Sequence, residues 1–371
     1  MINFLILLFF GFNSCNFNKD FIKKSYNIST NINIQLNKEY NEIYPKKNVI
    51  LGLIQNYSFD RILPFFESLL KINFENCDIV MFVRSISPEI INYLRNIGVL
   101  VIMIPKSYNN VSAINVRWKM YGDFLKDKTN KYNLVLHTDV RDTFFQKDIF
   151  KYYKDYKSFL GVAIEDGTLE DRLLKKWIID YVGKEKYKKI SNERIICIGQ
   201  LLGTIDKFLE FSIFFWQKLE ESPRAIEQGI YNYLIYNDKI FKDYIVKSDN
   251  YGPIMTIGLT ELNKIHLDSK NNILNFNNEI ASVVHQYDRK KDIVKIVINK
   301  FCPELFVFYR NTNFILKKKN FSHDYEFNRT IPTQSIEINK YNQNIIYFLL
   351  LLQLITIFIL LKTRFSLFFK L

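Results

Sequence analysis

The chain of 371 residues has few cysteines, no apparent internal repeat and no concentrated basic surface. Its four cysteines, Cys15, Cys77, Cys197 and Cys302, show no metal-ligand spacing and are too few for a disulfide scaffold. The net charge is +13, yet the lysines are spread over separate stretches and form no single amphipathic basic helix. Nucleic acid is therefore not the expected partner. A nucleotide diphosphate or an anionic membrane surface suits the same sign of charge.

Two apolar runs lie near the ends of the chain. Residues 4–12 are too few to span a bilayer but suit a signal sequence, and no lysine or arginine precedes them, so residues 1–15 are either a cleaved signal peptide or a signal anchor. Residues 345–361 are uncharged and long enough for a spanning helix, with a buried soluble helix as the alternative. Basic residues follow this run more densely than they precede it, which predicts a cytosolic tail at 362–371 and a lumenal body.

A lumenal body predicts a single-pass protein of the endoplasmic reticulum or Golgi membrane, or of the cell surface. Five acceptor patterns for N-glycosylation fit this route, although a chain so rich in asparagine also produces such patterns by chance. They begin at Asn27, Asn56, Asn110, Asn320 and Asn328.

The region between the two apolar runs alternates strand and helix patterns. Residues 16–47 are polar and aperiodic, which is typical of a stem or linker. Residues 48–300 form the predicted catalytic domain, and residues 301–344 a juxtamembrane segment. Within the domain we expect strands at 49–54, 79–83, 99–104 and 134–137, and helices at 60–72, 88–98 and 116–126. This alternation predicts an α/β fold with a mostly parallel sheet that is covered on both faces.

The most informative stretch, at residues 132–150, reads YNLVLHTDVRDTFFQKDIF. A short apolar strand runs directly into Asp139 and Asp142, and the carboxyl end of such a strand is where an α/β fold holds a metal and a phosphorylated ligand. Two carboxylates held close together disfavour joint ionisation unless a cation or hydrogen bonds compensate them. The alternative is that Asp139 caps a helix beginning near Val140.

Five segments together resemble the GT-A nucleotide-sugar glycosyltransferases, and the nearest pattern is the group with a TDVRD acidic motif followed by FQ and a further Asp. The resemblance covers residues 49–289. It implies a GT-A-like, Rossmann-type fold and a hexosyl- or related transferase that moves a sugar from a nucleotide-diphosphate donor to a glycan, protein or lipid acceptor. The segments are RWKMYGDFL (117–125), YNLVLHTDVRDTFFQ (132–146), CIGQLLGT (197–204), IEQGIYNYLIY (226–236) and VVHQYDR (283–289).

The resemblance implies that Asp139 contacts the donor and a bridging Mn²⁺ or Mg²⁺. The sequence departs from the usual Asp-x-Asp pattern, because Arg141 occupies the place of the second aspartate. Either Arg141 neutralises phosphate directly, or Asp142 is the second metal ligand. A salt bridge or a turn cap is the structural alternative for Asp142.

The remaining implied site residues lie in the other segments. Arg117 would bind the donor phosphates or sugar, with a surface ion pair as the alternative. His285 resembles the late histidine that completes the metal site of glycogenin-like transferases, although a structural histidine fits the same setting. Glu227 and Gln228 resemble an Asp-Gln pair that approaches the transferred sugar or the acceptor. Gly203 would admit the donor closely, unless it serves a tight turn.

Two other classes of protein compete with this interpretation. One is a metal-dependent phosphohydrolase of the haloacid-dehalogenase type. The residues DVRDT loosely resemble the Asp-x-Asp-x-Thr motif of that class. The other is a catalytically inactive GT-A-fold membrane protein with a binding or structural role. The sequence leaves open the sugar, the acceptor and the anomeric outcome; Glu165, Asp166 and Glu227 are the candidates for a general base.

Overall fold

The structure, a computed structural model, describes residues 46–237 and 243–303. These residues fall in the first of two compact units, Met1–Asn313 and Phe314–Leu371. The predicted signal sequence, nearly all of the stem, the spanning segment 345–361 and the tail 362–371 lie outside the described residues. Across the described ranges, no helix is both long enough and apolar enough to cross a bilayer.

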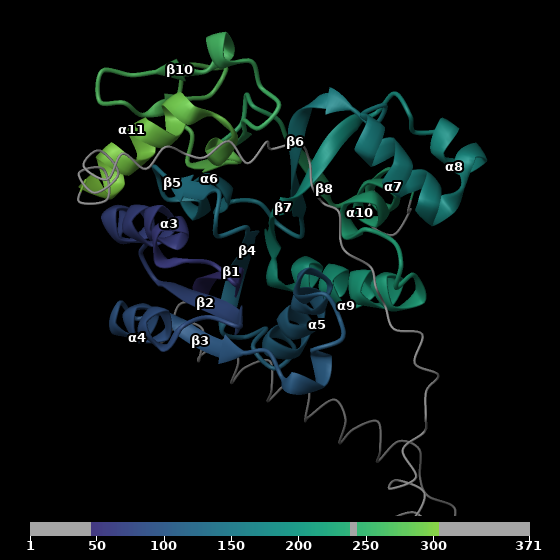
Figure 1. The fold of residues 1–371 in the computed structure, drawn as a ribbon, viewed down its shortest axis with the longest axis horizontal. Coiled ribbons are helices and arrows are strands. Elements are labelled where there is room, and N and C mark those ends of the chain that lie inside the picture. The colour runs from purple at the N-terminus through teal and green to yellow at the C-terminus, as the bar shows by residue number, and fades with distance from the viewer. Residues whose placement is uncertain (1–45, 238–242, 304–371) are drawn as a thin grey trace, which may run out of the picture. The chain divides into compact units, whose positions relative to one another are not determined.

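A seven-stranded sheet forms the centre of the described unit, in the order β3-β2-β1-β4-β7-β6-β8 (Figure 1). β3, β2, β1 and β4 run parallel, as do β6 and β8, whereas β7 is antiparallel to both of its neighbours. The sheet is therefore mixed and mostly parallel, as the sequence predicts. Its strands are β1 (Lys47–Gln55), β2 (Cys77–Arg84), β3 (Leu100–Met103), β4 (Tyr132–Thr138), β6 (Leu160–Thr168), β7 (Arg194–Thr204) and β8 (Ile245–Ser248).

The first four strands and first three helices match the predicted segments closely. α4 begins as expected, with Pro88 in its first turn and the Ser87 hydroxyl accepting a hydrogen bond from the Ile90 backbone N–H. α5 begins three residues earlier than predicted, directly after Ser112. The helices are α3 (Phe59–Ile72), α4 (Pro88–Asn96), α5 (Ala113–Leu125), α6 (Ile149–Tyr153), α7 (Arg172–Val182), α8 (Lys184–Lys188), α9 (Ile205–Glu221), α10 (Glu227–Asn237) and α11 (Lys291–Phe301), with 3-10 turns η2 (Lys106–Tyr108), η3 (Leu262–Lys264) and η4 (Tyr287–Arg289).

Helices cover both faces of the central sheet. Alternate residues of a strand point to opposite faces, so Val49 and Leu51 of β1 pack in one cluster with α5, α9 and α10. Ile50 and Ile54 of the same strand pack in a second cluster with α3, α4 and α6. Because strands buried on both faces read as continuous apolar runs, the β1 sequence VILGLI already indicates this three-layer arrangement.

A small three-stranded sheet, in the order β5-β12-β9, lies beside the carboxyl end of β4. β12 pairs antiparallel with β5, which places His285 opposite Thr143. α11 packs against this sheet through a cluster that includes Phe144, Val284 and Val297. The strands are β5 (Thr143–Phe145), β9 (Ile254–Thr256) and β12 (Val283–His285), and a separate hairpin joins β10 (His266–Leu267) to β11 (Ile273–Leu274).

A bulge in β7 shapes the same edge of the central sheet. Opposite β6, the pairing steps from Cys197 directly to Leu201, so residues 198–200 have no partner on that strand. Opposite β4, the ladder continues as far as Gln200. Side chains of α10 replace part of the missing β6 partners: Gln228 accepts a hydrogen bond from the Ile198 backbone N–H at 3.1 Å.

Candidate functional site

The loop that joins β4 to β5 carries the acidic motif and consists of residues 139–142. None of them is helical, so the alternative of Asp139 as a helix cap at Val140 is wrong. The Asp139 backbone N–H donates to the Gly199 carbonyl oxygen at 2.9 Å, which extends the β4–β7 ladder one step past Thr138. Asp139 thus lies at the carboxyl end of a buried strand.

The two ends of this loop are joined by a buried glutamine. The Gln200 side-chain amide donates to the hydroxyl oxygens of Thr138 and Thr143, at 2.8 and 2.9 Å. All three side chains are fully buried. Because the loop ends cannot separate without breaking these bonds, the two aspartates between them are held at a fixed spacing.

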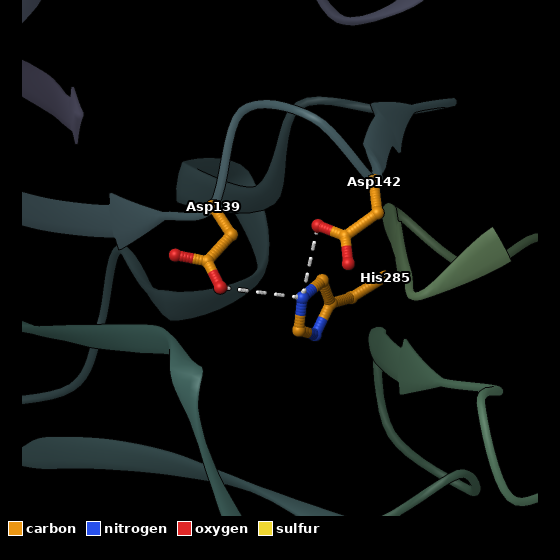
Figure 2. A group of neighbouring side chains, drawn as sticks. All are labelled: Asp139, Asp142 and His285. Atoms are coloured by element: carbon orange, nitrogen blue, oxygen red, sulfur yellow. Dashed lines mark ion pairs between the residues drawn. The ribbon is translucent and has the colours of Figure 1, made fainter. Parts of the chain in front are cut away.

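Asp139, Asp142 and His285 meet at this edge of the sheet (Figure 2). One ligand atom from each residue lies within 4.8 Å of the others. The His285 Nε2 atom is 3.4 Å from Asp142 Oδ1 and 3.9 Å from Asp139 Oδ2, and both carboxylates point toward it. Asp142 and His285 are buried, whereas the Asp139 side chain is 39% exposed, so the group opens to solvent on one side.

The chemistry of this group fits a divalent cation. Within the described residues, no atom has hydrogen-bond geometry with the buried His285 Nε2. The other ring nitrogen, Nδ1, lies 3.5 Å from the Cys197 sulfur, which leaves Nε2 facing the two carboxylates. Carboxylate oxygens are ligands that Mg²⁺ and Mn²⁺ prefer, and imidazole is a common ligand of divalent transition-metal ions.

Asp142 and His285 shift each other's pKa. Burial raises the pKa of Asp142, but His285 and Arg141 outweigh that effect and hold the pKa well below its usual range. Burial lowers the pKa of His285, while Asp142 and Asp139 raise it to a net value above the ordinary one. Cationic neighbours thus compensate the two carboxylates that the motif holds close together.

Arg117 lies beneath the acidic motif and is only 3% exposed, so the interpretation as a surface ion pair is wrong. Its Nη1 is 2.8 Å from Asp139 Oδ1 and its Nη2 is 2.7 Å from Glu227 Oε1. Burial lowers the pKa of Arg117, but Glu227 and Asp139 more than reverse that effect, so the guanidinium keeps its charge. Arg117 thereby fixes one oxygen of Asp139 and leaves the other facing His285.

Glu227 and Gln228, at the first turn of α10, have their side chains committed to protein partners. Both Glu227 oxygens are used, since Oε2 accepts from the Trp118 indole N–H at 3.1 Å. Burial raises the pKa of Glu227 to about 7, against the opposing effect of Arg117 and Trp118. Gln228 bonds to the backbone of β7 at Ile196 and Ile198. In this structure the pair positions Arg117 and β7, and its predicted approach to sugar or acceptor stays a prediction.

Arg141 and Asp142 form an ion pair at 3.2 Å, and the Arg141 Nε also lies 3.3 Å from Asp288. Asp142 uses Oδ2 for Arg141 and Oδ1 for His285. Asp142 therefore forms the salt bridge that was the structural alternative to a metal-ligand role, and it also belongs to the group with Asp139 and His285. The two hypotheses, Arg141 at the phosphate and Asp142 at the metal, are compatible in one geometry.

Gly203 is the predicted site residue that the structure separates from the others. It lies opposite Val135, four residues along β7 from Gly199, and not in a tight turn. A methyl group there would lie 2.8 Å from the Phe159 carbonyl oxygen, so the close approach of β6 accounts for the glycine. The neighbours of Gly203 are therefore residues at the start of β6, and none belongs to the acidic loop.

Three residues near the acidic loop were not anticipated as site residues. A methyl group on Gly199 would lie 2.5 Å from His285 Cε1 and 2.7 Å from Asp139 Oδ2, so only glycine fits there. Cys197, predicted to be a small buried residue, is buried but also contacts His285. Tyr57 follows β1, and its pKa is raised to about 12 by burial and by Asp139. In the sequence, only the position of Tyr57 shortly after the predicted first strand could have indicated that it lies near the site.

The three candidate general bases all accept hydrogen bonds within the protein. Glu165 is buried and accepts from the Gln286 amide at 3.0 Å. Asp166 accepts from Thr260 at 2.6 Å and pairs with an arginine at the start of β7. Glu227 is held by Arg117 and Trp118.

Comparisons with known proteins give distant likenesses only. The sequence matches no protein-family model and no curated protein. Among solved structures, the galactosyltransferase LgtC in complex with donor and acceptor sugar analogues is 15% identical with a TM-score of 0.44, over 67% of this chain and 95% of that one. An active-site mutant of LgtC gives the same identity and score. The glycosyltransferase GlyE of Streptococcus pneumoniae TIGR4 is 13% identical with a TM-score of 0.43, over 72% of this chain and 64% of that one. Similarities this low establish neither a shared fold family nor a shared activity.

Proposed function

We propose that this chain is a glycosyltransferase of the GT-A type that moves a sugar from a nucleotide-diphosphate donor to an acceptor hydroxyl. The observation that carries the proposal is the group of Asp139, Asp142 and His285 at the carboxyl edge of a mostly parallel sheet. Ligands bind at this edge in open α/β sheets. The sequence resemblance over residues 49–289 supports the same assignment.

Asp139, Asp142 and His285 would hold the Mn²⁺ or Mg²⁺. Such a cation, when bound, supplies positive charge against the diphosphate leaving group. In the transfer, the bond between the anomeric carbon and the diphosphate oxygen breaks and its electron pair stays on the diphosphate. The acceptor oxygen forms the new bond to carbon and loses its proton to solvent.

The residues of this chain prepare the site for that reaction. Arg117 orients Asp139, and the brace of Gln200 with Thr138 and Thr143 fixes the loop between the two aspartates. The Arg141 guanidinium is 31% exposed and next to Asp142, where it can contact a phosphate oxygen. Preorganised charges of this kind need no rearrangement as the leaving group departs.

The proposal places the enzyme in the endoplasmic reticulum or Golgi membrane, or at the cell surface, with the catalytic domain lumenal. It rests on the apolar segment 345–361 and the basic residues after it, all outside the described residues. The acceptor would be a glycan, a protein or a lipid.

The test of the function is a donor screen of the detergent-solubilised full-length chain with and without Mn²⁺, which measures released nucleotide diphosphate and transferred sugar. We expect Asp139→Asn to lower transfer by on the order of a hundredfold or more, because it removes the charge that anchors the cation while it keeps the shape. Asp292→Asn, on the exposed face of α11, is the matched control and should leave transfer unchanged. Transfer by Asp139→Asn at the wild-type rate would show that the site is misplaced.

The same screen separates the competing classes. A catalytically inactive binding protein would retain donor binding and release no diphosphate. A phosphohydrolase would release inorganic phosphate from phosphomonoesters. The phosphohydrolase motif needs a second carboxylate at position 141, where this chain has an arginine that pairs with Asp142.

A further inference from the structure

A cavity opens at the same edge of the central sheet, beyond the acidic loop. It has a volume of about 370 Å³ and is lined by the ends of β6 and β8, the start of β7 and the segment that contains Phe276. β6 and β8 run in the direction of β4, so Asp166, near the end of β6, and Asp249, directly after β8, lie toward the edge where Asp139 follows β4. Apart from Asp166, a candidate general base, the residues that line this cavity have no role in the proposed function.

One wall of the cavity is an aromatic side chain held in place. Tyr251 is 54% exposed, and its ring meets Phe276 edge to face with centroids 5.3 Å apart. Its backbone is anchored at both ends: the N–H donates to the Asp249 carboxylate at 3.0 Å, and the carbonyl oxygen accepts from Asn275 and Asn277. An exposed ring on an anchored backbone, packed against Phe276, offers an apolar platform with a polar tip.

The other lining groups are polar and mixed in charge. The Arg194 Nη2 donates to Asp166 at 3.1 Å and to the Glu165 carbonyl oxygen at 3.0 Å. Within the described residues these bonds use only Nη2, so the other guanidinium donors of Arg194 remain for a ligand. Asp166 and Asp249 outnumber the single arginine, which disfavours a phosphate or another anion in the cavity.

This combination of walls identifies a class of ligand. The C–H groups on one face of a pyranose ring pack on an aromatic platform, and its hydroxyl groups need donors and acceptors at the rim. Arg194 supplies donors, and the carboxylates of Asp166 and Asp249 supply acceptors. A neutral sugar satisfies the cavity, whereas a nucleotide diphosphate leaves its charge against two aspartates.

The cavity is linked to the proposed metal site. The Gln286 amide, directly after His285, donates to Glu165, directly before Asp166, at 3.0 Å. β6 and β8 lie two and three strand positions from β4, which corresponds to roughly 10–15 Å across the sheet. A glycan chain of a few sugars is long enough to extend over that separation, and a monosaccharide is not.

We infer that the cavity between Tyr251 and Arg194 is a subsite for a neutral oligosaccharide acceptor, and that it holds an inner sugar while the terminal one faces Asp139. The inference rests on the proposed function and selects a glycan from its three acceptor classes. It assigns Tyr251 as the residue that determines acceptor affinity.

The test measures binding of neutral oligosaccharides (lactose, maltotetraose, mannotriose and chitotriose) to the full-length chain by saturation-transfer NMR and calorimetry, without donor. We expect at least one of them to bind, Tyr251→Ala to weaken it by about tenfold or more, and Tyr251→Phe to retain most of the affinity. Tyr152→Ala removes a comparably exposed tyrosine on α6 and should change nothing. Thermal unfolding of each variant checks that the fold is intact.

Turnover supplies the second readout. Tyr251→Ala should raise KM for the bound oligosaccharide with donor hydrolysis by water unchanged. Equal binding by wild type and Tyr251→Ala, or no binding of any probe by wild type, overturns the inference. A third outcome separates the two proposals. If oligosaccharides bind in a Tyr251-dependent way but the chain turns over no sugar nucleotide, the subsite is supported and the proposed function is overturned.

Discussion

At the scale of single residues, the two carboxylate oxygens of Asp139 have different environments. Oδ1 is 2.8 Å from the buried Arg117, and Oδ2 faces His285 at 3.9 Å. The contact of Oδ1 with Arg117 thus orients the side chain, which stays partly exposed to solvent. A ligand oriented in advance loses little freedom when a cation binds, and removal of the group that orients a ligand typically costs about 10–100-fold in metal affinity.

We predict that Gly199→Ala lowers Mn²⁺ affinity by at least about tenfold, because the new methyl group would lie 2.5 Å from the His285 ring and 2.7 Å from Asp139. Calorimetric titration with Mn²⁺ measures the change. Gly203→Ala on the same strand is the matched control, since its methyl group meets β6 and not the acidic loop. It should lower the melting temperature and leave Mn²⁺ affinity unchanged. Equal Mn²⁺ affinities for Gly199→Ala and wild type would contradict the metal site.

A second prediction concerns the buried pair of Arg117 and Glu227. Arg117→Met should lower the free energy of unfolding by about 3–5 kcal/mol, because it leaves the Glu227 carboxylate buried without its partner. The double variant Arg117→Met with Glu227→Gln should recover part of that loss, since an amide carries no charge and still accepts from Trp118. Urea denaturation of both variants, with the exposed Arg95→Met as control, measures the difference. A loss below 1 kcal/mol in the single variant would show that solvent reaches Glu227.

The sequence predicted the residues of the cluster better than their surroundings. Asp139 directly follows β4 and His285 is the last residue of β12, and the apolar run before each is visible in the letters alone. Gly199 and Gly203 lie in one run, CIGQLLGT, and only the bulge of β7 decides which glycine faces the site. Register over a bulge depends on the partner strand, which a single sequence does not show.

At the scale of the elements, the amino edge of the sheet is joined by ion pairs. Asp78 at the start of β2 lies 2.9 Å from Lys47 of β1 and 2.6 Å from Lys131, and it accepts a hydrogen bond from Tyr132 of β4. One carboxylate therefore connects three neighbouring strands at the edge farthest from the acidic loop. Burial raises the pKa of Asp78, but the lysines and Tyr132 outweigh it and lower the pKa.

This network predicts a pH dependence. A carboxyl group with a lowered pKa in the folded state stabilises the fold above its unfolded pKa of about 3.9, and that contribution is lost as the pH falls through the folded value. Asp78→Asn should cost about 1 kcal/mol at pH 7, since pairs of this exposure contribute roughly 0.2–1 kcal/mol each. The gap to wild type should shrink below about pH 4. Denaturant titrations from pH 3 to 7 test this, and a gap that does not change with pH would assign the loss to packing.

Among the elements, those with local signals were predicted and those with distant partners were not. β1 to β4 and α3 to α5 follow apolar periodicity and caps such as Ser87-Pro88. The reversed direction of β7 and the pairing of β5 with β12 join segments far apart in the chain. Three-residue strands such as β12 are also too short for any periodicity to appear.

At the scale of the whole molecule, we predict that the body of the chain is lumenal and that residues 362–371 are cytosolic. Protease added to sealed microsomes should remove only a tag placed at the C-terminus, and it should digest the body once detergent is added. Asn56 and Asn110 are exposed in the structure, so removal of either acceptor pattern should abolish any glycan attached there and increase gel mobility. Digestion of the body in sealed vesicles would reverse the assignment.

The pairing of β12 with β5 also has a consequence for how the protein is synthesised. The chain leaves the ribosome from its amino end, so β1 to β4 and the acidic loop emerge long before β12. His285 joins Asp142 only when β12 docks on β5, a long-range contact that forms late. A nascent chain that ends before residue 285 carries both aspartates without the histidine. Under the proposed function, the complete ligand set exists only after translation has passed residue 285, and products truncated before that residue lack it.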